Sequence, residues 1–134
     1  MSLMVDAVVM SDVPVVCRML AGILDGARDV RVRWTGHPDD LGVGMSAGIP
    51  QVVILHMHDT KVAQRLADSL QECALPTILV DQDGAIRNVG LERLPTAPHV
   101  CLDGPMGQGN RAWRRFGNTL LDAVRRLAAE ASAE

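Results

Sequence analysis

An uninterrupted apolar run that ends in two histidines constrains the fold of this chain more than any other stretch. Residues 52–55 read Val-Val-Ile-Leu, and His56, Met57 and His58 follow directly. A short run without polar alternation is typical of a central strand in a parallel sheet, where helices cover both faces. Ligand and reaction sites in such sheets lie at the carboxyl ends of the strands. His56 is therefore predicted to stand at the functional edge of the sheet.

Four other segments have the composition of strands, and they cover residues 4–10, 30–34, 76–80 and 99–102. In residues 30–34, apolar residues alternate with Arg31 and Arg33, which predicts a strand with one side in water. Charged side chains discourage edge-to-edge pairing with another sheet, so we expect this strand at an edge.

Helical patterns connect the strands. One helix is predicted after Pro14, a second after a cap at Asp59 or Thr60, and a third near the C-terminus. Their predicted buried faces are Val16, Met19, Leu20, Ile23 and Ala27; Val62, Leu66, Ser69 or Leu70, and Cys73; and Trp113, Phe116, Leu120, Val124 and Leu127. Residues 38–40 should begin only a short helix because glycines follow, and residues 85–94 show weak helical periodicity.

The whole pattern fits one domain. Five strands alternating with helices in 134 residues predict a doubly wound α/β domain over about residues 4–130, and residues 1–3 are consistent with a cloning leader. The net charge of −3 gives no reason to expect nucleic acid or an anionic membrane as partner. Without an apolar run of about 18 residues, we expect a soluble cytoplasmic protein. The cysteines, Cys17, Cys73 and Cys101, form no CxxC pair and are expected to be reduced.

Several segments together match a known pattern. They are Ala7-Val8-Val9-Met10-Ser11-Asp12, Asp29-Val30-Arg31-Val32, Pro50-Gln51-Val52-Val53-Ile54-Leu55 and Pro76-Thr77-Ile78-Leu79-Val80. Through them the chain resembles the receiver domain of bacterial two-component response regulators, and most of all the receiver of chemotaxis methylesterases. The resemblance extends over nearly the whole chain. It implies a flavodoxin-like three-layer sandwich around a five-stranded parallel sheet with the order 2-1-3-4-5.

The phosphorylation site of receivers is altered here at almost every position. The acidic pair that holds Mg²⁺ at the end of strand one reads Ser11-Asp12, and the phosphoacceptor aspartate falls on His56. The Ser or Thr at the end of strand four falls on Asp81. The lysine of strand five falls on Gly104, and the aromatic switch residue falls on Cys101.

These replacements predict a chain that does not undergo aspartyl phosphorylation. An acyl phosphate needs a carboxylate nucleophile and cations that hold the phosphate charge. An aspartate at position 81 would instead repel the phosphate oxygens. We expect Asp12, Asp81 and perhaps Asp103 to converge on His56 and raise its pKa, so that an imidazolium replaces the missing cation.

The resemblance implies a signalling module that acts by protein–protein interaction and not an enzyme, with other signalling proteins as partners and no cofactor or bound metal. A homodimer stays open. Receivers make such contacts through the helix before the fifth strand, which falls here on about residues 85–94, through the fifth strand and through the last helix, which puts Arg114 and Arg115 on the expected surface.

Three alternatives belong to other classes. The chain could be the regulatory domain of a methylesterase-type response regulator whose catalytic domain lies outside it. It could also be a small metal-binding enzyme that uses His56 and His58, since imidazoles two residues apart share one side of an extended chain. A flavin or nucleotide binder is disfavoured because few aromatic residues are present for stacking.

Overall fold

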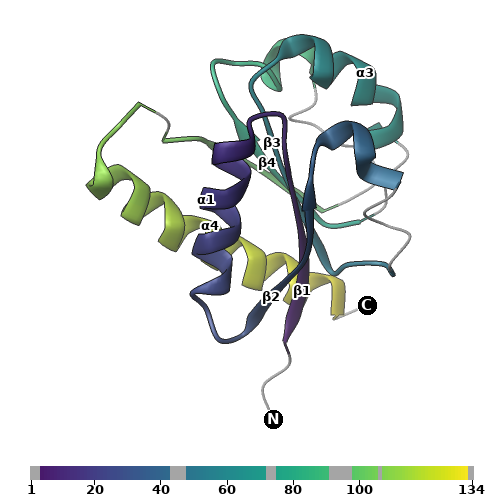
Figure 1. Cartoon of the computed structure of the whole chain (residues 1–134). Helices are drawn as coiled ribbons and strands as arrows, with labels where there is room; N and C mark the ends of the chain where they lie inside the picture. The colour runs from purple at the N-terminus through teal and green to yellow at the C-terminus, as the bar shows by residue number, and fades with distance from the viewer. Residues whose placement is uncertain (1–3, 43–47, 72–74, 91–97, 106, 133–134) are drawn as a thin grey trace.

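Five strands form a single parallel sheet with the order β2-β1-β3-β4-β5 (Figure 1). The computed structural model describes residues 4–42, 48–71, 75–90, 98–105 and 107–132. The strands are β1 (Val5–Ser11), β2 (Val30–Gly36), β3 (Val52–Met57), β4 (Thr77–Asp81) and β5 (His99–Asp103). The helices are α1 (Pro14–Asp25), α3 (Thr60–Gln71) and α4 (Asn110–Ser132), with short 3-10 turns η1 (Pro38–Asp40) and η2 (Arg87–Val89). The predicted strand order and the edge position of β2 are confirmed.

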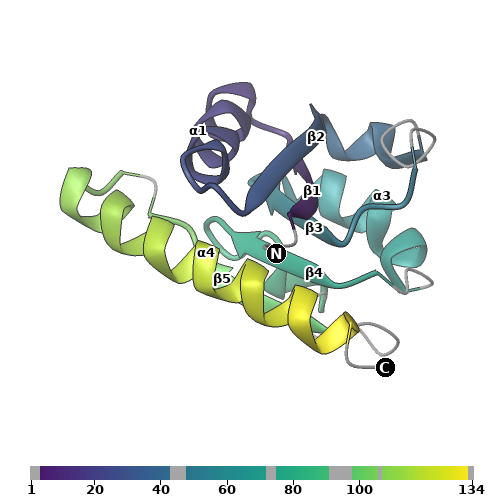
Figure 2. The same ribbon diagram turned by 90° about the horizontal axis from the view of Figure 1, so that it is seen from below.

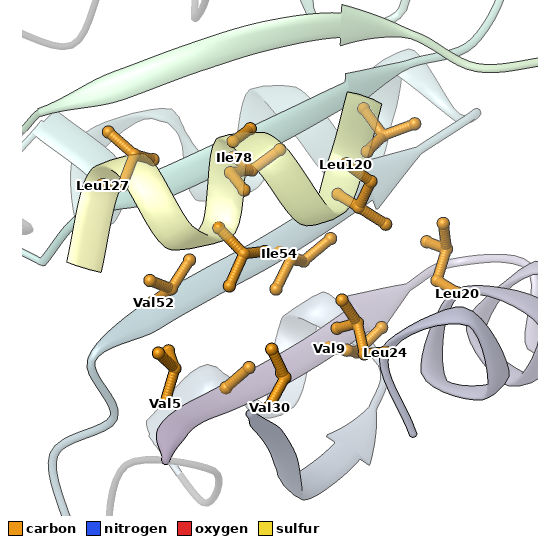
Figure 3. Packing of buried hydrophobic residues seen from close by; sticks show 14 of the residues in the cluster. Val5, Val9, Leu20, Leu24, Val30, Val52, Ile54, Ile78, Leu120 and Leu127 are labelled. Carbon is orange, nitrogen blue, oxygen red and sulfur yellow. The ribbon is translucent and has the colours of Figure 1, made fainter. Parts of the chain in front are cut away.

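Helices cover both faces of the sheet. Helices α1 and α4 lie on one face and α3 on the other (Figures 1 and 2). Strand β3, at the centre, is buried at every residue, as its apolar run predicts. Figure 3 shows the larger core cluster, in which strand residues such as Ile54 and Ile78 pack against Leu20 of α1 and Leu120 of α4. On the last helix, the predicted buried residues Phe116, Leu120, Val124 and Leu127 are buried, whereas Trp113 is only half-buried and packs against the edge of this core. Among the described helices, none is long and apolar enough to cross a membrane.

Helix α1 begins at Pro14, where the fixed φ and missing N–H of proline suit the first turn. Its buried residues are Val16, Cys17, Leu20 and Leu24. Placing Met19 on the buried face was wrong, because its side chain is 40% exposed and borders a cavity at the end of the sheet.

The two-residue alternation of the strands decides which face each strand end serves. In β3, Val52 and Ile54 pack under α1 and α4, so His56 points to that same face. In β4, Leu79 packs under α3, so Asp81 points to the opposite face from His56. This separation organises the site described below.

An irregularity in β2 moves its tryptophan from one face of the sheet to the other. Ala7 pairs with Val32 but Val8 pairs with Trp34, so Arg33 is an extra residue that the register between β1 and β2 skips. Val32 consequently packs against the core under α1 and α4, whereas Trp34 packs against the core under α3. A Cβ atom at Gly36 would lie 2.4 Å from the indole ring of Trp34, so this ring requires glycine there.

Two predicted helical segments differ in kind from α-helices. Residues 85–90 form a turn followed by η2. Gly90 caps the C-terminal end of η2 with a φ of 73°, a left-handed conformation that glycine adopts without strain. The prediction of a helix there is wrong for these residues, and residues 91–97 lie outside the described parts. The short helix expected near residue 38 is confirmed as η1. In α3, Ser69 is exposed, so the buried stripe does not include it, while Cys73 and residues 1–3 lie outside the described residues.

Candidate functional site

The end of β1 and the end of β3 bring a serine and a histidine together under α1. Ser11 lies beside His56 in the sheet register, and its Oγ is 2.7 Å from Nδ1 of His56. The Ser11 Oγ accepts the N–H of Val13 at 2.9 Å and also lies 3.1 Å from the carbonyl of Val13. That carbonyl already accepts the N–H groups of Val16 and Cys17. We therefore assign the hydroxyl proton to Nδ1, which makes His56 the tautomer with a proton on Nε2.

His56 is a neutral imidazole at neutral pH. His56 is only 1% exposed, and this burial lowers its pKa to about 4, although the charges of Asp12 and Asp81 oppose the shift. The predicted rise in the pKa of His56 is therefore wrong. The cost of moving the charged ring out of water exceeds the attraction of the carboxylates, and none of them contacts the ring.

The Asp12 carboxylate binds the backbone that follows β3. The N–H of His58 donates to both oxygens of Asp12 at 2.9 and 3.0 Å, and the N–H of Asp59 donates to Oδ2 at 2.7 Å. Three backbone bonds occupy this carboxylate. Asp12 therefore fixes the turn after β3.

Asp81 and Asp103 meet an arginine on the α3 face, and the expectation that they converge on His56 is wrong. They are neighbours in the register of β4 and β5. Asp81, with its side chain 1% exposed, accepts the N–H of Ile86 at 2.9 Å and lies 3.3 Å from Nη1 of Arg87, which also donates to Asp103. The hydrogen bond with Asp103 is the main cause of a raised pKa of Arg87, and the charge of Asp81 contributes to it. The N–H of Gly104 donates to the carbonyl of Asp81 at 2.9 Å.

Sequence reasoning missed Arg87. It lies in a segment that was interpreted as a weak helix, and its role depends on two acids being level in neighbouring strands. The sequence did hold a signal for this acidic pair. Asp81 and Asp103 lie at the same distance from the starts of their strands, and parallel strands in register bring equivalent positions side by side.

The residues at this edge do not fit the Mg²⁺ site that the receiver resemblance implies. Mg²⁺ requires several oxygen ligands in near-octahedral geometry. Here the end of β3 carries the imidazole of His56, the Asp12 carboxylate accepts backbone N–H groups, and Asp81 is paired with Arg87.

The two histidines are likewise not arranged as a pair of metal ligands. The Nε2 atom of His58 lies 3.1 Å from Asp83 and its side chain is 54% exposed, while His56 points inward to Ser11. Within the described residues no group of three His, Cys, Asp or Glu side chains could hold a metal ion.

A cavity of about 670 Å³ opens over His56 on the α1 face of the strand ends. Its lining includes Val13, Val15, Met19, His56, Gln82 and Trp113. A smaller cavity of about 250 Å³ is lined by the end of β5 and by α4 and includes Asp103, Gly104 and Arg115. Arg114 and Arg115 are both exposed on α4. Neither Cys17, which is buried, nor Cys101, which is half-buried, is in a disulfide.

Known structures with this architecture include two response regulator domains. The response regulator domain of CheB from Thermotoga maritima matches with a TM-score of 0.69 over 94% of this chain and 97% of that chain, at 16% identity. The chain has the receiver fold. The response regulatory domain of protein mrkE from Klebsiella pneumoniae matches with a TM-score of 0.57 over 96% of this chain and 99% of that chain, at 10% identity. No protein-family model and no curated protein sequence matches this receiver-fold chain.

Proposed function

We propose that this receiver-fold protein is a signalling module that acts through protein contacts and is not switched by aspartyl phosphorylation. The observation that carries the proposal is His56. A buried, neutral imidazole hydrogen-bonded to Ser11 stands at the end of β3, where receivers carry the phosphoacceptor aspartate. Its Nδ1 lone pair is already occupied, so the ring presents no nucleophile to a phosphoryl donor.

The charges around this edge support the same proposal. Arg87, a cation at the ends of β4 and β5, is paired with Asp81 and Asp103. An arriving phosphoryl group would meet the negative charge of Asp81 and Asp103. The guanidinium of Arg87 would not be free to stabilise its charge, because it is already paired with these two carboxylates.

The phosphorylation part of the proposal is tested with acetyl phosphate and Mg²⁺, using intact-protein mass spectrometry. A receiver with an intact aspartate site, treated in parallel, supplies the positive control. We expect no added phosphoryl group on the wild-type protein. An adduct on any residue of this chain would refute the proposal, and fragmentation would locate the acceptor.

We propose that the partner surface is formed by β5 and α4, where Arg114 and Arg115 are exposed. The partners would be other signalling proteins, with a second copy of the chain as one case. The double variant Arg114→Glu/Arg115→Glu should lose at least tenfold in affinity for a partner or in self-association. Arg126→Glu, an exposed arginine farther along the same helix, is the matched control and should bind normally. Equal binding by all three proteins would place the contact elsewhere.

A second candidate is the regulatory domain of a methylesterase-type response regulator. The match to the CheB domain, which spans 97% of that domain, favours this candidate. The open reading frame beyond codon 134 decides it. A catalytic domain in the same frame would support the candidate, and a frame that continues without one would remove it.

A further inference from the structure

The cavity over His56 lies at the carboxyl edge of the sheet, between the start of α1 and the start of α4. Its volume of about 670 Å³ falls within the range of small-molecule sites, about 300–1,000 Å³. His56 belongs to the lining, and its neutral ring brings no charge to it. The nature of a ligand is therefore decided by the other lining residues, which form an apolar group and a polar group.

The apolar group of the lining is open to solvent. Val15 and Met19 of α1 are 52% and 40% exposed, and they are two of the four large apolar side chains that are exposed in the described parts of the chain. Trp113 of α4 is half-buried and lines the same cavity. Exposed apolar side chains gathered around one hollow mark a binding site more often than scattered ones do. A ligand of this cavity therefore needs an apolar body.

The polar group contains one acid, Asp83, which is also open to solvent. The side chain of Asp83 is 71% exposed. One of its oxygens lies 3.1 Å from Nε2 of His58, and the other accepts from Nε2 of Gln82 at 3.3 Å. A carboxylate has about four lone-pair sites, so Asp83 can accept a further donor without losing these contacts.

The charge around the cavity is negative. Among the described residues that line it, none is Lys or Arg. Asp12 and Asp59 add two further carboxylates at the adjoining turn, where Asp12 accepts the N–H of His58. Arg18 follows Met19 closely on α1, but it lines a different cavity beside the end of β2. A positively charged ligand would therefore be attracted to this edge, and an anion would be repelled.

We infer that this cavity binds a small organic cation with an apolar body, such as an arylalkylamine. The ammonium group donates to the exposed carboxylate of Asp83, and the apolar body packs on Val15, Met19 and Trp113. All four side chains line the one cavity, and its volume admits a molecule of this size. The inference does not depend on the proposed partner surface, and it holds whether or not the chain accepts phosphate.

The test uses three probes with the same ring, which are phenethylamine, 2-phenylethanol and phenylacetate. Each is titrated at neutral pH and low salt into ¹⁵N-labelled protein and followed by NMR. Phenethylamine should shift the amide signals of Val15 and Met19 and the indole signal of Trp113. Its affinity should be about threefold to fivefold above that of 2-phenylethanol, as expected for one exposed ion pair, and higher still relative to phenylacetate. Added salt should reduce this preference.

Two pairs of variants separate the charge from the apolar contact. Asp83→Asn keeps the shape of the side chain but removes its charge, so the preference for phenethylamine over 2-phenylethanol should disappear. Asp25→Asn, which removes an exposed acid at the far end of α1, is the matched control and should preserve it. Met19→Gln should weaken the binding of both probes, whereas Met4→Gln, at an exposed methionine just before β1, should leave both unchanged.

Several results would overturn the inference. Equal affinity for phenethylamine and 2-phenylethanol in the wild type would reduce the cavity to an apolar surface, and a preference for phenylacetate would give its charge the wrong sign. A preference that persists in Asp83→Asn would place the cation elsewhere. Sedimentation in parallel covers the last case, because a second copy of the chain that seals the cavity against all three probes would also contradict the inference.

Discussion

Replacing His56 by phenylalanine should change how stability depends on pH, because the folded protein resists protonating this ring. In the unfolded chain the imidazole takes up a proton near pH 6.5, whereas burial lowers the pKa of His56 in the fold to about 4. Between these values the unfolded state binds more protons than the folded one. The stability of the wild type is therefore complete above pH 6.5 and is lost as the pH falls toward 4.

The size of this loss follows from the same two values. Each pH unit within the interval removes about 1.4 kcal/mol, so His56 should withdraw about 3 kcal/mol from the free energy of unfolding between neutrality and pH 4. A loss of that size is a large part of the stability of a small domain. Phenylalanine fills a similar volume among apolar neighbours and cannot be protonated, so the variant should escape this loss.

Urea unfolding of the wild type and of His56→Phe at intervals from pH 4 to 8 measures the difference. Other groups titrate equally in both proteins, so subtracting the curves isolates His56. His37→Gln, which alters a histidine at the surface, should keep the steep loss of the wild type because His56 is intact. Parallel curves for the wild type and His56→Phe would refute the reasoning, as would an NMR titration that finds the pKa of His56 at or above 6.5.

Other consequences can be tested on single variants. The ¹⁵N shifts of the His56 ring should show the tautomer protonated at Nε2, and Ser11→Ala should mix the two tautomers; a ring protonated at Nδ1 in the wild type would reverse the hydrogen-bond assignment. Leu120→Ala, in the core, should cost about 2–5 kcal/mol of unfolding free energy, whereas the exposed Arg126→Ala should cost within about 0.5 kcal/mol. Deleting Arg33 should destabilise the fold far more than Arg33→Ala, since only the deletion removes the extra residue of β2.

The fold could be predicted from the sequence because its signals are local. The apolar run of β3, the alternation in β2 and the apolar face of α4 each predict an element, and the resemblance supplies the strand order. Met19 was misplaced because three- and four-residue spacing identifies a helix but sets its rotation only to within a residue.

The site was predicted less well because its geometry depends on pairs of elements. Ser11 and His56 were correctly expected at one edge, but the acids were expected on the wrong face. The alternation along β4 turns Asp81 away from His56. Asp81 instead pairs with Arg87, which lies in a segment that the sequence pattern led us to interpret as a helix. The pKa of His56 also depends on how deeply the ring is buried under α1 and α4, and no sequence motif predicts that burial.

The extra residue in β2 leaves the two tryptophans of the chain in separate halves of the core. Trp34 packs in the cluster under α3, and Trp113 lies beside the cluster under α1 and α4, edge-on to Phe116 with ring centroids 5.9 Å apart. Fluorescence of Trp34→Phe and Trp113→Phe thus reports on the two sides of the sheet separately. Coincident unfolding transitions would mean that the sheet and both helical layers melt as one cooperative unit, and separated transitions would mean that one layer comes off first.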